Sequence, residues 1–310
     1  MKALVPVVLL LVACRPDSDQ VVFKMQAQSF ANSAWSEPEN LGTAINTAAN
    51  EQGPSLSGDE LSLYFGSDRP GFGVTDLWVA HRACRDCPWD SPVNLGPTIN
   101  TAANESGPSL SVDGHLLFFT SNRLGGPGGQ DLYVSHRSDP NDDLGWEPPV
   151  ALGPGVNTPA NEAGAEYLQS AEDGQANFYF NRGVGGTTDL YSAALTRSGE
   201  TLGPAVRIDE LSDPIALDQG ATVRKDGREM FFFSSRSVSI GAVDLWTATR
   251  RSIHDPWSTP VNLGEPINST GAEQQPSLSF DGRTLLYASS RSGSVGGTDI
   301  WMVTRSPNGQ

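Results

Sequence analysis

One acidic residue recurs at the same place in a phrase that appears five times along the chain. It stands directly before a short predicted strand each time. The five residues are Glu51, Glu105, Glu162, Asp218 and Glu273. If these strands surround one axis, the carboxylates ring one mouth of a central channel. Such a ring costs repulsion unless arginines, water or a cation neutralises it. We therefore expect either structural pairing with arginines of the repeat or a site for a cation or a cationic peptide.

Glu166 is the carboxylate that has no counterpart in the other copies. The third repeat reads Ala165-Glu166-Tyr167-Leu168 where the first, second and fifth repeats read Pro-Ser-Leu-Ser. Glycoside hydrolases use a carboxylic acid and a carboxylate base at a separation that fixes the stereochemistry. A glycoside hydrolase that uses channel carboxylates, with Glu166 as the catalytic residue, is therefore one hypothesis. Most of the acids belong to the regular repeat, however, so the sequence favours a binding protein that is not an enzyme.

Other catalytic and cofactor chemistry finds little support. His81 and His136 occupy one repeat position, and His115 and His254 are expected in a turn and a loop, so no Ser-His-Asp arrangement is suggested. No glycine loop follows a strand and opens a helix, so no phosphate cradle is expected. We expect no cofactor and no metal.

Cys84 and Cys87 form a lone Cys-x-x-C in His-Arg-Ala-Cys-Arg-Asp-Cys-Pro-Trp. A structural zinc site needs a second pair, and His81 gives only a third ligand. A redox Cys-x-x-C normally opens a helix, whereas this one falls between predicted strands. We expect a disulfide that staples a loop, with metal and redox chemistry as the alternatives.

The elements that must position these residues are five similar repeats. Each repeat holds an aromatic-rich run, Ser-x-Arg (Phe-Asn-Arg in the third repeat), a loop with glycine and an Asp that opens a strand. The opening Asp residues are spaced by 55, 58, 55 and 55 positions, at Asp76, Asp131, Asp189, Asp244 and Asp299. A period of this kind with short strands instead of helices is typical of a β-propeller.

The second repeat shows how one blade is built. It predicts strands at 108–111, 116–120, 131–136 and 146–152, with Asp113-Gly114 as the first hairpin turn. The first repeat inverts this turn to Gly58-Asp59. The chain opens with a fourth-strand phrase at 35–41 and ends with three strands at 276–304. We therefore predict an all-β, five-bladed propeller over 35–305 whose ring is closed by the N-terminal strand.

Two further residues recur in every repeat. The Arg of Ser-x-Arg precedes the Asp by seven or eight positions, and we expect the two to pair and close the loop. These arginines are Arg69, Arg123, Arg182, Arg236 and Arg291. An aromatic residue follows each Asp by two positions, and we expect it to pack between neighbouring sheets. These aromatics are Trp78, Tyr133, Tyr191, Trp246 and Trp301.

The phrases at 109–123 and 277–291 resemble the WD-like propeller repeats of the TolB family and related bacterial envelope proteins. The resemblance covers roughly 35–305. It implies a propeller that acts as a scaffold for contacts in the cell envelope. No second domain is evident, so a role in the Tol system is not implied.

The N-terminus reads as an export signal. Met1-Lys2 is followed by an apolar stretch and by Leu11-Val12-Ala13-Cys14, which resembles the lipobox of bacterial lipoproteins. We expect a signal peptide at 1–13, a lipidated Cys14 with a tether at 14–34, and a tail at 306–310. Arg15 after the cysteine then implies the outer membrane of a Gram-negative cell, with the chain anchored by lipid alone.

The charge of the chain narrows its partners. The formal net charge is −16, and the chain has three lysines, Lys2, Lys24 and Lys225. Counterion release would oppose nucleic-acid binding, so we expect no nucleic-acid partner. The resulting hypothesis is a monomeric, lipid-anchored envelope propeller that binds an envelope protein or a glycan.

Overall fold

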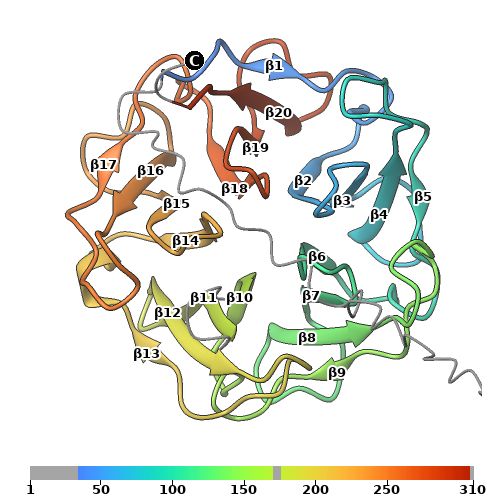
Figure 1. Cartoon of the computed structure of the whole chain (residues 1–310), viewed down its shortest axis with the longest axis horizontal. Coiled ribbons are helices and arrows are strands. Elements are labelled where there is room, and N and C mark those ends of the chain that lie inside the picture. The colour runs from blue at the N-terminus through green and yellow to red at the C-terminus, as the bar shows by residue number, and fades with distance from the viewer. Residues whose placement is uncertain (1–33, 170–175, 308–310) are drawn as a thin grey trace, which may run out of the picture.

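The computed structural model describes residues 34–169 and 176–307, which form five blades around one axis (Figure 1). Each blade is a sheet of four antiparallel strands, so the predicted all-β five-bladed propeller is confirmed. The expected signal peptide, Cys14, nearly all of the tether and the end of the C-terminal tail lie outside the described residues. Within the described ranges, no helix is long and apolar enough to cross a bilayer.

The strands of each blade run from the axis outward in chain order. Blade 1 holds β2 (Glu51–Leu56), β3 (Ser62–Ser67), β4 (Asp76–His81) and β5 (Val93–Asn94). Blade 2 holds β6 (Glu105–Leu110), β7 (Leu116–Ser121), β8 (Asp131–His136) and β9 (Val150–Ala151). Blade 3 holds β10 (Glu162–Gln169), β11 (Ala176–Val184), β12 (Thr187–Leu195) and β13 (Val206–Arg207). Blade 4 holds β14 (Asp218–Val223), β15 (Glu229–Ser234), β16 (Asp244–Thr249) and β17 (Val261–Asn262), and a 3₁₀ turn, η1 (Asp209–Leu211), precedes it.

Blade 5 combines both ends of the chain. It holds β18 (Glu273–Leu278), β19 (Thr284–Ser289), β20 (Asp299–Thr304) and, as its outer strand, β1 (Glu39–Asn40). β1 pairs antiparallel with β20, with Asn40 opposite Trp301 (Figure 1, blue beside dark red). Closure by the N-terminal strand is therefore confirmed, and it covers the edge that β20 would otherwise expose.

Aromatic side chains fill the space between neighbouring blades. Phe118 of blade 2 stacks on Tyr167 of blade 3, with ring centroids 5.0 Å apart. Tyr64 of blade 1 meets Trp146 of blade 2 edge to face. The aromatics two residues after the repeated Asp lie in or against these interblade clusters, as predicted. Because such rings bury a large apolar area, they account for much of the packing between sheets.

The first hairpin turn of blade 1 differs from the prediction. Asp59 and Glu60, not Gly58 and Asp59, occupy the turn positions that Asp113 and Gly114 hold in blade 2. The same arginine contact shows the equivalence: Nε of Arg82 donates to the carbonyl of Glu60 at 2.7 Å, as Nε of Arg137 does to Gly114 at 2.6 Å. Glu60 therefore takes the left-handed position that glycine takes elsewhere, with φ of 64°.

Candidate functional site

The five repeated carboxylates form no open ring at the channel mouth. Each residue is fully buried and is ion-paired with the Arg of Ser-x-Arg in its own repeat. The pairs are Glu51–Arg69 (2.8 Å), Glu105–Arg123 (3.1 Å), Glu162–Arg182 (2.7 Å), Asp218–Arg236 (2.9 Å) and Glu273–Arg291 (3.3 Å). In blade 1 the backbone N–H and hydroxyl of Thr47 also donate to Glu51. Because these carboxylates accept hydrogen bonds from groups of the protein, they join each blade to the segment that precedes its first strand.

The expected pairing of that Arg with the Asp that opens the third strand is wrong. Arg69 reaches Glu51, whereas Asp76 accepts the backbone N–H groups of Phe72 and Gly73 and the side-chain amide of Asn94. A glycine-rich loop turns its free N–H groups toward the Asp, which leaves the Arg for the buried Glu. The guanidinium also stacks over Trp78, 5.2 Å from the ring centroid.

Glu166 lies on β10 and faces the axis, but the channel there is nearly closed. Its Oε1 accepts hydrogen bonds from the N–H of Val223 (3.1 Å) and the hydroxyl of Thr222 (3.3 Å). Burial raises the pKa of Glu166, and Lys225 opposes the rise. The cavity is about 70 Å³, well below the roughly 300–1,000 Å³ of typical ligand pockets.

The channel is narrow because glycines of adjacent blades meet around the axis. A Cβ on Gly53 would lie 3.0 Å from Cα of Gly107. Gly53, Gly107, Gly164 and Gly220 all have positive φ, and Gln275 takes their position in blade 5 with φ of 51°. The backbones therefore pack directly, and no sugar fits beside Glu166. Catalysis at Glu166 stays an untested prediction that this geometry does not favour.

Ser62, His81 and Asp143, which the sequence did not connect, meet between blades 1 and 2. Nε2 of His81 lies 2.5 Å from Asp143, and Oγ of Ser62 lies 3.2 Å from Nδ1 of His81 and 3.3 Å from the same carboxylate. Asp143 also accepts from Tyr64 and Arg137. Because this carboxylate serves four donors and Ser62 bonds to it directly, the cluster joins two blades and does not prepare a nucleophile.

Arg137 belongs to a second repeated feature that sequence reasoning missed. An Arg directly after the third strand stacks on the Trp that precedes the fourth strand in four of the five blades. The pairs are Arg82–Trp89, Arg137–Trp146, Arg250–Trp257 and Arg305–Trp35, with the guanidinium carbon 4.2 to 4.5 Å from the ring centroid. The recurrence of an Arg after the third strand and of a Trp before Asn-Leu-Gly or its variant is the signal that could have found them.

These arginines join neighbouring blades. Arg305 of blade 5 binds Glu229 of blade 4 through two nitrogens, at 2.8 and 2.7 Å. Arg137 of blade 2 and Arg250 of blade 4 donate to the hydroxyls of Tyr64 and Tyr179 on the preceding blades. Among the described residues, Arg82 of blade 1 has no hydrogen-bond or ion-pair partner on blade 5. Thr284 stands there at the start of β19, in the place that Glu229 has at the start of β15.

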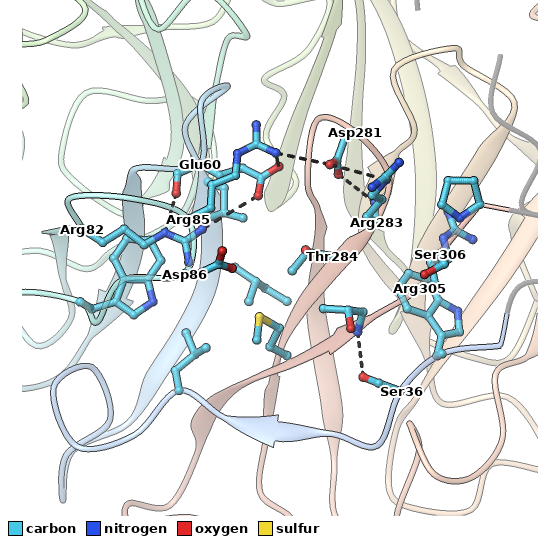
Figure 2. Close-up of a pocket in the computed structure, with 18 of the residues that line it drawn as sticks. Ser36, Glu60, Arg82, Arg85, Asp86, Asp281, Arg283, Thr284, Arg305 and Ser306 are labelled. Atoms are coloured by element: carbon cyan, nitrogen blue, oxygen red, sulfur yellow. Dashed lines mark hydrogen bonds and ion pairs between the residues drawn. The ribbon is translucent and has the colours of Figure 1, made fainter. Parts of the chain in front are cut away.

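The missing contact leaves a pocket of about 940 Å³ between blades 5 and 1, which we call the 5–1 pocket. Trp35 and Trp89, both partly exposed, contribute to its wall. Figure 2 shows Arg85 between Glu60 and Asp281, with Arg283 and Thr284 on the blade 5 side. Its volume suits a ligand several times larger than the channel could hold.

Glu60 is the unusual residue of this pocket. It is 5% exposed, and its Oε1 accepts no hydrogen bond among the described groups. Arg85 Nη1 lies 3.4 Å from Glu60 and 3.5 Å from Asp281, and Arg82 lies 3.9 Å from Glu60. Burial raises the pKa of Glu60, the Asp281 charge raises it further, and Arg85 and Arg82 oppose the rise. A strained backbone, a buried carboxyl with a raised pKa and an adjacent pocket are joint features of functional sites.

A disulfide holds the loop that supplies one wall of the pocket. Cys84 and Cys87 are bonded in the structure, with Cα atoms 4.9 Å apart. Between them stand Arg85 and Asp86, and Trp89 follows two residues later. No group of three or more His, Cys, Asp or Glu that could hold a metal ion occurs in 34–169 or 176–307.

No protein-family profile and no curated protein matches the chain. Solved structures do resemble it. The GH43 endo-arabinanase from Bacillus licheniformis has 12% identity and a TM-score of 0.61 over 84% of this chain and 94% of that chain. The α-L-arabinofuranosidase from Lactobacillus brevis has 16% identity and a TM-score of 0.57 over 86% and 96%. A putative TolB from Agrobacterium tumefaciens has 16% identity and a TM-score of 0.50 over 86% and 88%.

These comparisons correct the expectation that the chain is not an enzyme. Most of the similar structures are named as glycoside hydrolases of families 43 or 62 or as arabinofuranosidases, and this finding contradicts the expectation of a non-enzymatic scaffold. At 12 to 16% identity the likeness shows the shared five-bladed fold alone. The TolB resemblance is likewise one of fold. Any activity must be argued from the residues of this chain.

Proposed function

We propose that the protein is a glycoside hydrolase whose active site is the 5–1 pocket, with Glu60 as the proton donor. The observation that carries the proposal is the placement of Glu60: a buried carboxyl of raised pKa, held in a glycine position, beside a second carboxylate in a pocket walled in part by tryptophans. A glycosidase acid needs a raised pKa so that it is protonated when the substrate binds.

The reaction needs two carboxyl groups in different protonation states. Glu60 would give its proton to the glycosidic oxygen as the bond to the anomeric carbon breaks. Asp281, 30% exposed at its side chain, is the candidate general base that takes a proton from the attacking water as its oxygen bonds to the anomeric carbon. Arg85 flanks both carboxylates and is half exposed, so a bound sugar could displace its guanidinium group from between them. Trp35 and Trp89 line the pocket with an arginine guanidinium group over one face of each ring, and we propose that a sugar stacks against these aromatic side chains.

The test is hydrolysis of a panel of polysaccharides, with release of reducing ends as the readout. We expect the wild type to cleave at least one of arabinan, xylan, polygalacturonate and polymannuronate, and Glu60→Gln to lose at least a hundredfold in kcat. Glu166→Gln is the matched control and should keep the activity. Absence of cleavage across the panel, or activity that survives in Glu60→Gln, would overturn the proposal.

We further propose that the protein acts outside the cytoplasm as a lipid-anchored monomer of the outer membrane. Leu11-Val12-Ala13-Cys14 supports the anchor, and Cys84–Cys87 supports an oxidising compartment. Intact mass of the mature protein tests the anchor: an acylated Cys14 is expected at the first residue, and an unmodified mature chain would contradict it.

A further inference from the structure

The internal symmetry of the ring shows what chemical group the 5–1 pocket lacks. At the junction of blades 4 and 5, Arg305 stacks on Trp35, donates Nε to the turn carbonyl of Gly282 and binds the carboxylate of Glu229. At the junction of blades 5 and 1, Arg82 stacks on Trp89 and donates Nε to the turn carbonyl of Glu60 in the same way. The two sites therefore share an arginine, a tryptophan and a carbonyl, and they differ in the carboxylate.

Thr284 accounts for that difference. It opens β19 opposite Thr304, as Glu229 opens β15 opposite Thr249, so the two residues are equivalent. Threonine is too short to reach across the junction as the glutamate does, and it lines the pocket instead. The place taken by a carboxylate at the other junction is therefore part of the open volume here.

Arg82 lacks the close carboxylate that Arg305 has at the neighbouring junction, although Glu60, Asp86 and Asp281 also line the pocket. Arg82 has 12% of its side chain exposed, and the carboxylate it meets, that of Glu60, lies 3.9 Å away, against 2.7 and 2.8 Å for Arg305 and Glu229. Burial lowers the pKa of Arg82, as expected for a guanidinium group without close compensation. Arg85 and Arg283 add two partly exposed guanidinium groups at the rim, and both are ion-paired with Asp281, at 3.5 and 4.0 Å.

We propose that the 5–1 pocket recognises glycans that contain uronic acid, with the sugar carboxylate bound by Arg82 and Arg85 in the place that Glu229 occupies at the neighbouring junction. This inference rests on the proposed function and names its substrate class. Arginine binds carboxylates through two parallel hydrogen bonds, which gives geometric as well as charge selectivity. Partly exposed Trp35 and Trp89 favour a sugar ring over an acidic peptide as the bearer of that carboxylate.

Calorimetric titration with charged and uncharged forms of one sugar chain tests the proposal. The probes are the trimers of galacturonic acid and mannuronic acid, each beside its methyl ester. We expect at least one acid trimer to bind tenfold or more tightly than its ester, with affinity that falls as salt rises. Equal affinities for acid and ester, or tighter binding of an acidic peptide such as tetraglutamate, would overturn the proposal.

Two substitutions locate the binding. Arg82→Gln should lower the affinity for the acid trimer at least tenfold, while Arg250→Gln, the same change at a junction that already has its partner, should leave it unchanged. Thr284→Glu should supply the missing carboxylate from within: it should abolish binding and raise the melting temperature. Binding that survives in Thr284→Glu would refute the carboxylate position even if Arg82→Gln folds poorly.

The outcomes also separate this inference from the proposed function. Cleavage of a neutral glycan that depends on Glu60, without binding of the acid trimers, would remove the uronate inference alone. Binding of an acid trimer that depends on Arg82, without hydrolysis of any glycan, would remove the hydrolase proposal alone.

Discussion

Replacement of Glu60 by glycine tests whether the left-handed backbone conformation of this residue lowers the stability of the protein. Its φ of 64° lies in the left-handed region that Gly114, Gly227 and Gly282 occupy in other blades, at 74°, 71° and 74°. Alanine at this position keeps the strain and glycine relieves it, and neither residue carries the charge or the rest of the side chain. The comparison of Glu60→Gly with Glu60→Ala therefore isolates the backbone contribution to the free energy of unfolding.

The magnitude follows from two opposing effects. A residue with a Cβ in the left-handed region costs roughly 1–2 kcal/mol, and glycine gives back about 0.4–1 kcal/mol through the entropy of the unfolded chain. Glu60→Gly should therefore be more stable than Glu60→Ala by about 0.5–1 kcal/mol. At about 2–4 °C per kcal/mol for a large domain, the melting temperature should be about 2 °C higher.

Scanning calorimetry of the two variants measures this difference, with Val238 as the control. Val238 also has a positive φ, 70°, but is 82% exposed and lies outside the 5–1 pocket. Val238→Gly should be more stable than Val238→Ala by a similar amount and should keep full activity, whereas Glu60→Gly should be inactive. A Glu60→Gly protein that melts below Glu60→Ala would refute the argument that the backbone is strained at this position.

Three other predictions concern pH, the disulfide and ring closure. Because burial and Asp281 raise the pKa of Glu60, the folded protein holds the Glu60 proton more tightly than the unfolded chain does. The stability of the wild type relative to Glu60→Gln should therefore be greatest below the ordinary carboxyl pKa of 4.5 and should fall as the pH rises through the raised pKa. A difference in urea midpoints that does not change with pH across this window would contradict the raised pKa. The double substitution Cys84→Ser and Cys87→Ser should lower the melting temperature only slightly, since the loop that the disulfide closes is short. It should raise KM for a cleaved glycan several-fold, because Arg85 and Trp89 would no longer be held in place. An unchanged KM would show that the disulfide does not position the pocket residues. Deletion of residues 34–42 should expose the edge of β20, which pairs with β1 in the full chain. Because the hydrogen bonds of β1 contribute about 0.5–1.5 kcal/mol each, light scattering should show aggregation or thermal unfolding should show a large fall in melting temperature. A truncated protein that melts like the full chain would contradict ring closure as a source of stability.

The fold could be predicted because the same sequence pattern occurs in each of the five blades. The Asp that opens each third strand fixes the period, and the fourth-strand phrase at 35–41 has no partner except the blade that ends the chain. The short outer strands were predicted too long: Trp146 turns into the interblade core, so β9 begins at Val150. Such packing depends on the neighbouring blade and leaves no mark in the local pattern.

The site was harder to predict because it arises from differences between repeats at a junction. The left-handed conformation of Glu60 was not predicted, because the turn was expected at Gly58-Asp59 and lies at Asp59-Glu60 in the structure. Arg85 and Asp281, 196 positions apart, meet only when the ring closes. The carboxylates that recur in all five repeats were candidates for a binding site, but each forms a buried ion pair within its own repeat, as Glu51 does with Arg69. Residues that break the repeat, Glu60 and Thr284, define the pocket.

A crystal structure of Glu60→Gln with a bound oligosaccharide, chosen from the glycan that the wild type cleaves, tests the central claim most directly. An active site in the 5–1 pocket requires a sugar there, with the scissile oxygen within hydrogen-bond distance of the substituted amide side chain and a ring against Trp89 or Trp35. A sugar bound in the central channel beside Glu166, with the 5–1 pocket empty, would contradict it.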